Sequence, residues 1–259
     1  MTKSRLLRIF RSRAFRLTVV TMLAITLVWM GAQQQQGQRY QEIALHLLPE
    51  DQEALVHEEK IMEMLHEEQL LPATRSMDEI RLDAIETALA RNPFCRSTEA
   101  YWDIEGNLHI DFQQRQPLLR IIDMSNRQYY LDESLRVMPL SERFTAHVPI
   151  VSGFIDEEMP HDGILRSPAG KRIRAWARQM QQHDFFHVVS NQIRIEKDGA
   201  LVLISALGGH RFVLGDTTRW NDKLLKLKVF YREILPRKGW SRYDTVYLNF
   251  ENQIVANTR

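Results

Sequence analysis

The 259-residue sequence has little of several features that often decide a protein's class. Cys95 is the single cysteine, which excludes an intramolecular disulfide framework, so any exported domain must be held by a buried apolar core. The eleven glycines are scattered and form no phosphate-binding loop. The formal net charge is only +1, so the chain lacks the basic excess expected of a nucleic-acid partner. A long apolar run occurs once, near the N-terminus, and there is no internal repeat.

This apolar run follows a basic arm. Residues 1–16 carry six basic and no acidic side chains, and residues 17–32 contain no charge. A bilayer core of roughly 30 Å needs about 20 helical residues, so the run is short but sufficient if Arg16 extends its side chain to the headgroups. Because the basic side of a span stays in the cytoplasm, the pattern predicts a single-pass type II membrane protein with the rest of the chain exported.

A cleavable signal peptide is the alternative interpretation. Signal peptidase sites have small residues at −3 and −1, whereas Met30-Gly31-Ala32 places methionine at −3. Both interpretations export the remaining chain, which has 28 basic and 33 acidic residues and therefore a net charge of −5. Residues 33–38 are a polar, glutamine-rich linker before the first folded domain.

Residues 39–118 have the pattern of one β-α-α-β-β domain. Period-2 alternation predicts a strand over 40–48, and helical periodicity predicts a helix over 57–69. A second helix is expected to begin at a capping box formed by Ser76 and Glu79. A β-hairpin follows, in which Ala100, Trp102 and Ile104 alternate before the turn and Leu108, Ile110 and Phe112 after it. The predicted core includes Leu82, Ile85, Leu89, Ile110 and Phe112.

Residues 119–259 change to short strands and turns with added helices. Ser167-Pro168 predicts a helix start, followed by a buried stripe at Ile173, Trp176, Ala177 and Met180. A last helix is expected over 218–235, ended by Pro236, and a closing strand pair over 245–250 and 253–256. The predicted fold class is therefore α+β, with an N-terminal transmembrane helix, a small sheet domain and a mixed β-sheet domain with two or more helices.

The best candidate for a catalytic or metal site is the stretch from His183 to His187. It places two histidines four residues apart with an acid between them, as in the H-E-x-x-H helix of zinc proteases. The acid is Asp184, one methylene shorter than glutamate, and no third ligand is indicated nearby. We therefore predict no metal, no cofactor, no small-molecule substrate and no catalytic residues. Cys95 is predicted to be a small buried hydrophobic residue, and Asp156-Glu157-Glu158 a solvated loop.

Three stretches together resemble one known family. Residues 85–121, "IETALARNPFCRSTEAYWDIEGNLHIDFQQRQPLLRI", resemble the second half of a POTRA domain. Residues 129–153 resemble the start of the β domain that follows POTRA in the FtsQ/DivIB cell-division family, and residues 214–256 resemble its last helix and closing strands. The form is most similar to that of Bacteroidetes-type bacteria. One departure is the turn after Asp132, where the family usually has a glycine and this chain has Glu133-Ser134-Leu135.

The resemblance implies a non-enzymatic divisome assembly protein in the inner membrane at the division septum, with its bulk in the periplasm. It also implies FtsB-like and FtsL-like single-span proteins as partners. The domain organisation would be a cytoplasmic arm (1–16), a transmembrane helix (17–32), a linker (33–38), a POTRA-like domain (39–118) and a β domain (119–259).

A strand edge at the C-terminus is the expected partner site, since an exposed edge offers unpaired backbone groups to an incoming strand. Tyr247 and Phe250 are expected to anchor the partner on opposite faces, while Leu248 packs on the core. The predicted contact residues are Val246, Tyr247, Asn249, Phe250, Gln253, Ile254, Val255 and Ala256.

Two alternatives come from other classes of protein. An outer-membrane assembly factor would need several POTRA copies or a following barrel, and its membrane span would not lie at the N-terminus. A membrane-anchored periplasmic metal hydrolase would use His183 and His187.

Overall fold

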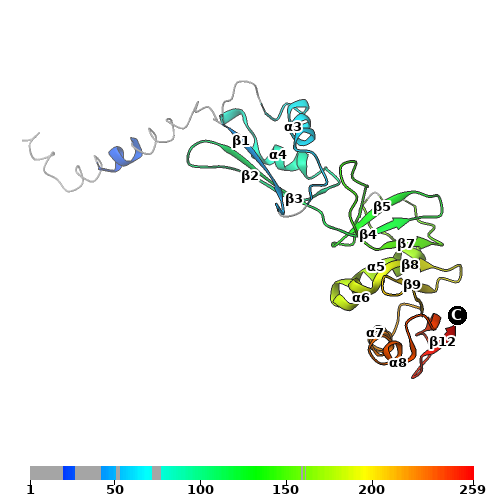
Figure 1. The fold of residues 1–259 in the computed structure, drawn as a ribbon. Coiled ribbons are helices and arrows are strands. Elements are labelled where there is room, and N and C mark those ends of the chain that lie inside the picture. The colour runs from blue at the N-terminus through cyan, green and yellow to red at the C-terminus, as the bar shows by residue number, and fades with distance from the viewer. Residues whose placement is uncertain (1–19, 27–41, 51–52, 72–76, 159, 161) are drawn as a thin grey trace, which may run out of the picture. The chain divides into compact units, whose positions relative to one another are not determined.

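The computed structural model describes residues 20–26, 42–50, 53–71, 77–158, 160 and 162–259 (Figure 1). The chain forms two compact units. The first unit contains Glu58–Arg91, Ser97–Phe112 and the chain up to Glu50, and the second contains Asp51–His57, Asn92–Arg96 and Gln113–Arg259.

Residues 20–26 are helical. The rest of the predicted span 17–32 lies outside the described residues, as do the basic arm and the linker. Within the described ranges, no helix combines the length and the apolar composition needed to cross a membrane.

The first unit confirms the β-α-α-β-β order. Its elements are β1 (Ile43–Leu48), α3 (Glu58–Glu67), the short 3₁₀ helix η1 (Met77–Glu79), α4 (Leu82–Leu89), β2 (Cys95–Trp102) and β3 (Leu108–Gln114). The three strands form one sheet in the order β1-β3-β2. Ile85, Leu89, Ile110 and Phe112 are fully buried as predicted, and Leu82 is half-buried. The apolar periodicity of both helices and of β3 therefore identified most of this core.

Two details of this unit were predicted wrongly. Helix α4 begins at Leu82, later than expected, with Arg81 as a cap residue that makes no side-chain cap bond. The predicted capping box includes Ser76, which lies outside the described residues, so the box itself stays a prediction. Ile104 is 99% exposed rather than part of the strand. The Asp103 carboxylate accepts from the N–H groups of Glu105 (2.9 Å) and Asn107 (2.8 Å), and this side-chain turn ends β2 before Ile104.

Replacing Leu89 by alanine is expected to lower the free energy of unfolding by about 2–5 kcal/mol, because the side chain is fully buried in the first unit. Chemical denaturation monitored by circular dichroism measures this loss. Leu82→Ala, on the same helix but half-buried, is the matched control and should lower stability less. Equal stability of Leu89→Ala and the unsubstituted protein would contradict the assigned core.

The second unit contains one nine-stranded sheet with helices (Figure 1). The strand order is β12-β11-β10-β9-β8-β7-β4-β5-β6. The elements are β4 (Pro117–Ile122), β5 (Gln128–Asp132), β6 (Val137–Met138), β7 (Ile150–Gly153), α5 (Pro168–Gln182), α6 (Asp184–Val189), β8 (Ser190–Ile195), β9 (Leu201–Ser205), β10 (Arg211–Gly215), α7 (Trp220–Val229), the π-helical segment η2 (Phe230–Ile234), α8 (Leu235–Lys238), β11 (Tyr243–Tyr247) and β12 (Val255–Thr258). The pairs β4–β7, β7–β8 and β10–β11 are parallel and the others antiparallel, so the sheet is mixed as expected.

Helix α5 begins as predicted. The Ser167 hydroxyl accepts from the Gly170 N–H at 2.9 Å, and Pro168 occupies the first helical position. The predicted stripe of Ile173, Trp176, Ala177 and Met180 is buried in the core of the second unit.

Glu157 was predicted wrongly as part of a solvated loop. Its side chain is buried, and its carboxylate accepts from the N–H groups of Arg166 (2.8 Å) and Ser167 (3.1 Å) and from the Ser167 hydroxyl. This places a negative charge at the positive end of α5, where it stabilises the helix. Gly170 makes the approach possible, because a Cβ there would lie 2.2 Å from the Glu157 carboxylate.

The sequence analysis predicted that the last helix ends at Pro236. In the structure it continues past this residue. After α7 the chain continues through η2 into α8, which ends at Lys238. Pro236 lies in the first turn of α8, where a missing N–H is tolerated best. Proline therefore marks a change of helical register here rather than the end of the helix.

The turn that lacks the family's usual glycine adopts a left-handed conformation nonetheless. Leu135 has φ +60°, and its N–H donates to the Asp132 carbonyl at 2.9 Å. Its side chain is buried in the core of the second unit, which compensates for a conformation that glycine adopts more readily.

Candidate functional site: the C-terminal sheet edge

Strand β12 forms one edge of the nine-stranded sheet and pairs with β11 alone. The pairing is antiparallel, with Val246 opposite Ala256 and Tyr247 opposite Val255. The sequence predicted a closing strand pair here but placed its strands at 245–250 and 253–256. In the structure β11 ends three residues earlier and β12 extends two residues further.

The backbone of β12 has one side that faces β11 and one that faces away from the sheet. The Arg259 N–H donates to the Arg242 carbonyl at 3.0 Å, so Arg259 faces β11. Inward and outward groups alternate along an antiparallel strand, so Asn257 and Val255 also face β11. The N–H and C=O groups of Ala256 and Thr258 therefore point outward, where they form the template that an incoming strand needs.

The apolar side chains of this edge divide between the two faces of the sheet. Ile254 and Ala256 are half-buried against the core of the second unit. Phe250 is 43% exposed and Val255 37% exposed. The rings of Phe250 and Tyr247 lie 6.1 Å apart, so these two residues form one cluster instead of anchors on opposite faces. Val255 is the cross-strand partner of Tyr247 and adds to the same cluster.

The remaining predicted contact residues differ in accessibility. Val246 is fully buried and its strand pairs on both sides, which removes it from the proposed contact surface. Asn249 is half-buried, and its Oδ1 finds no donor among the described residues. Gln253 is exposed. Leu248 is fully buried, as was predicted.

Strand β11 ends at Tyr247, where two cations contact the residues that follow: Arg219, the N-cap of α7, and Lys226 within α7. The Arg219 guanidinium donates to the carbonyl of Asn249 (2.9 Å) and to the carboxylate of Glu251 (2.7 Å). The Lys226 ammonium donates to the Phe250 carbonyl and lies 3.5 Å from the Leu248 carbonyl. Sequence reasoning missed both residues, since a basic side chain on a helix normally indicates a solvated face.

A buried lysine near the start of α7 explains the geometry of the preceding loop. The Lys223 ammonium is buried and donates to the carbonyl (2.8 Å) and carboxylate (2.7 Å) of Asp216. The hydrogen bond from Lys223 holds the pKa of Asp216 down at about 2. Burial lowers the pKa of Lys223, and the Asp216 carboxylate opposes that effect.

The lowered pKa of Asp216 predicts a pH dependence of stability. A carboxyl whose pKa falls on folding contributes stability above its unfolded pKa of about 4, and this contribution is lost as pH falls to about 2. Because this carboxylate is mostly exposed, solvent screening limits the contribution to about 0.5–1 kcal/mol. The difference in unfolding free energy between the unsubstituted protein and Asp216→Asn, measured by denaturation, should therefore be present at pH 6 and shrink towards pH 2. A difference that is constant from pH 6 to pH 2 would contradict this role.

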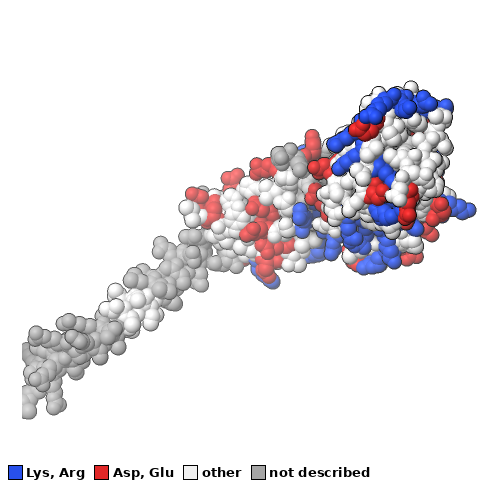
Figure 2. Space-filling view, turned by 90° about the horizontal axis from the view of Figure 1, so that it is seen from below, with Lys and Arg blue, Asp and Glu red and all other residues white. Residues whose placement is uncertain are grey.

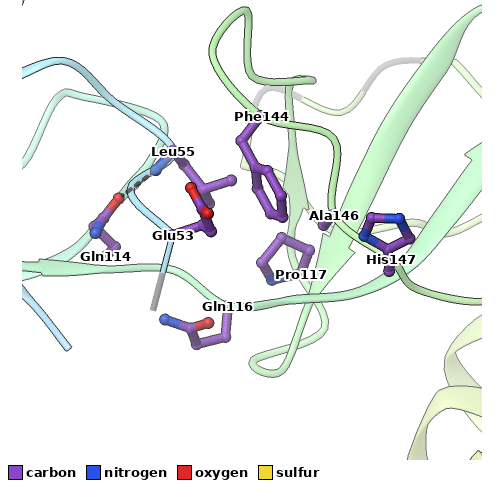
Figure 3. A pocket seen from close by; sticks show the side chains of 8 residues that line it. All are labelled: Glu53, Leu55, Gln114, Gln116, Pro117, Phe144, Ala146 and His147. Carbon is purple, nitrogen blue, oxygen red and sulfur yellow. Dashed lines mark hydrogen bonds between the residues drawn. The ribbon is translucent and has the colours of Figure 1, made fainter. Parts of the chain in front are cut away.

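A small cavity lies within the second unit, and none of its lining residues belongs to β11 or β12 (Figure 3). It has a volume of about 240 Å³ and is lined by Glu53, Leu55, Gln114, Gln116, Pro117, Phe144, Ala146 and His147. The Leu55 N–H donates to the Gln114 side chain at 2.7 Å, and the Ser141 hydroxyl donates to the Leu55 carbonyl at 2.6 Å. These bonds hold residues 53–57 in the second unit. The lining residues include no Ser, Thr, Cys or Lys side chain beside a base.

The two histidines and the cysteine considered for catalysis lie in segment 183–187 and at the start of β2. His183 lies between α5 and α6, and His187 is in the last turn of α6. The part of the chain that the structure describes holds no group of three or more His, Cys, Asp or Glu side chains suited to a metal. Cys95 is buried, which raises the pKa of its thiol to about 11, so it is a small hydrophobic residue as predicted.

Charge is distributed unevenly between the two units (Figure 2). The described residues of the first unit include fifteen acidic and three basic residues. Those of the second unit include seventeen acidic and 23 basic residues. The net charge of −5 that residues 17–259 carry together conceals this separation. Strand β12 thus belongs to the unit with the excess of basic residues.

Comparisons with known proteins agree with both units. A family model described as "FtsQ/DivIB, C-terminal related" matches residues 116–257, and a model of the POTRA-like domain matches residues 41–113. The chain is also 27% identical over 180 residues to the cell division protein FtsQ of Salinibacter ruber (strain DSM 13855 / M31). That alignment covers 66% of this chain and 67% of the relative. The first match alone covers more than half of the chain.

Proposed function

Since the chain belongs to the FtsQ/DivIB family, we propose that it is a non-enzymatic cell-division protein that captures a strand of a partner protein on β12. The partners would be FtsB-like and FtsL-like single-span division proteins, as the family resemblance implies. The single observation that carries the proposal is the unpaired outer side of β12, flanked by the exposed Phe250 and Val255 and the half-buried Tyr247.

The geometry fits strand addition in two respects. Main-chain groups of Ala256 and Thr258 point away from the sheet and supply donors and acceptors that do not depend on partner sequence. The aromatic cluster beside them supplies specificity, because large rings that become fully desolvated dominate the binding energy of most interfaces. The positive charge of the second unit accelerates the encounter with an acidic segment.

Topology is the second part of the proposal. Residues 1–16 would be cytoplasmic, residues 17–32 would cross the inner membrane, and both units would be periplasmic at the division septum. The domain boundaries 39–118 and 119–259 remain a prediction. A reporter that functions only outside the cytoplasm, fused after Arg259, should be active. Activity of a reporter restricted to the cytoplasm would contradict this topology.

Depletion in the native host tests the role in division. Cells that lose the protein should become filamentous and undivided, and re-expression should restore septation. Normal division after complete depletion would contradict the proposed function.

Phe250→Ala is expected to weaken binding of the FtsB-like and FtsL-like proteins by about 2 kcal/mol, roughly 30-fold, because the ring is an exposed anchor beside the strand edge. The melting temperature should change little. Phe154→Ala is the matched control, since Phe154 is 41% exposed but lies next to β7, far from β12 in the strand order. If both variants bind equally well, Phe250 is not an anchor.

A further inference from the structure

Three consecutive carbonyl groups after β11 face two cations, one at the N-cap of α7 and one within it. They belong to Leu248, Asn249 and Phe250, and their donors are Arg219 and Lys226. In a regular strand these carbonyls would alternate between the two neighbours of β11. Here all three turn towards one helix, so the chain leaves the sheet and then returns as β12.

One of the two cations, Lys226, lies in the interior of the second unit, whereas the Arg219 side chain is partly exposed. The side chain of Lys226 is almost fully buried, and its ammonium also donates to the Asp222 carboxylate at 2.6 Å. A cation is buried only where partners replace its water, and here backbone carbonyls supply part of that replacement. The contact between α7 and the 248–250 segment therefore differs from an exposed surface ion pair.

Arg219 has an unusual backbone conformation at the same place. It precedes the first residue of α7 and adopts φ +50° and ψ +41°, the left-handed region that residues other than glycine rarely occupy. Such conformations persist where surrounding contacts enforce them. The bonds from its guanidinium to Asn249 and Glu251 are the contacts that tie this end of α7 to the 248–251 segment.

We propose that Arg219 and Lys226 are positioning residues for partner recognition: they hold the 248–251 segment so that the Phe250 ring lies beside Tyr247 and β12 keeps a fixed register. The inference rests on the proposed strand capture at β12. The two cations act through the backbone of the segment and need not touch the partner.

Substitutions of Arg219 and Lys226 can distinguish an effect on partner binding from an effect on the stability of the fold. Arg219→Gly removes the guanidinium but suits the left-handed backbone, and Lys226→Met keeps an unbranched apolar stem while removing the charge. Each should weaken binding of the co-purified FtsB-like and FtsL-like proteins at least tenfold, with a melting temperature close to that of the unsubstituted full chain. The conservative variant Lys226→Arg should restore most of the affinity, because it returns a cation to the carbonyls.

The control is Lys228→Met on the same helix, whose ammonium lies over the Phe185 ring, 5.8 Å from its centroid, and contacts none of the three carbonyls in the described structure. It should bind normally. If Arg219→Gly and Lys226→Met remain folded and bind as well as the control, the positioning role is wrong.

Arg219→Gly and Lys226→Met could instead both melt at a lower temperature and lose binding only to the extent that they unfold. That result would also overturn the positioning role and would show that the two cations only stabilise the fold. The strand-capture proposal itself is tested separately by Ala256→Pro. If that variant binds normally, the proposed function fails. If it does not bind whereas Lys226→Met does, only the positioning role fails.

Discussion

Replacing Ala256 by proline should reduce the affinity for the FtsB-like and FtsL-like proteins by about 2–4 kcal/mol, roughly 30- to 1,000-fold, while the protein remains folded. The N–H of Ala256 points away from the sheet, so proline removes a donor that only a partner strand would use. The loss exceeds that of one hydrogen bond, because a partner carbonyl is left unpaired and the ring obstructs the incoming backbone. Isothermal titration calorimetry and thermal denaturation of the same preparation measure both quantities.

The neighbouring position provides the matched control for this prediction. The N–H of Val255 faces β11, so Val255→Pro should disturb the β11–β12 pair itself and lower the melting temperature. Opposite behaviour, with Val255→Pro folded and Ala256→Pro unfolded, would show that the inward and outward directions assigned to β12 are reversed.

Trp176→Ala should destabilise the second unit by about 3–5 kcal/mol, the usual effect of removing a buried tryptophan. The indole is fully buried, with the Phe186 ring at 4.8 Å and the Trp220 ring at 5.7 Å. It thereby joins α5, α6 and the start of α7 in one aromatic cluster. Urea denaturation monitored by circular dichroism gives the loss in free energy of unfolding.

Trp176→Phe is the control for this core residue. The indole Nε1 is buried and finds no acceptor among the described residues, so phenylalanine removes an unpaired donor as well as some volume. Its effect should be clearly smaller than that of alanine. Equal losses for the two variants would mean that the aromatic contacts contribute little.

Local periodicity predicted much of this fold. The apolar stripe of α5 and the alternation in β3 depend on neighbours within a few residues, and both were identified from the sequence. The order of the elements in the first unit followed from the same patterns. The serine that caps α5 was recognised because its donor lies three residues away.

Features fixed by distant residues could not be predicted in this way. The end of β11 depends on Arg219 and Lys226, which precede it by about twenty to thirty residues, so the alternating pattern alone extended the strand to Phe250. Glu157 was assigned to solvent because its partners Arg166 and Ser167 come nine and ten residues later. Buried charged groups of this kind are rarely visible in composition or spacing.

The net charge of residues 17–259 concealed how their charges are distributed. The value of −5 gave no indication that one unit is strongly acidic and the other basic. The acidic and the basic unit can be told apart only when each segment has been assigned to its unit. Segment 92–96 was not expected to belong to the second unit. Because the strand edge belongs to the basic unit, we expect high salt to screen its charge and to slow partner association.

Hydrogen exchange at single amides of β12 tests strand capture most directly. In the free full chain, the outward N–H groups of Ala256 and Thr258 should exchange rapidly, and those of Val255 and Asn257 slowly. Binding of the FtsB-like and FtsL-like proteins should slow exchange at Ala256 and Thr258 and leave the other two nearly unchanged. A stable complex in which Ala256 and Thr258 still exchange as fast as in the free chain would contradict partner binding at this edge.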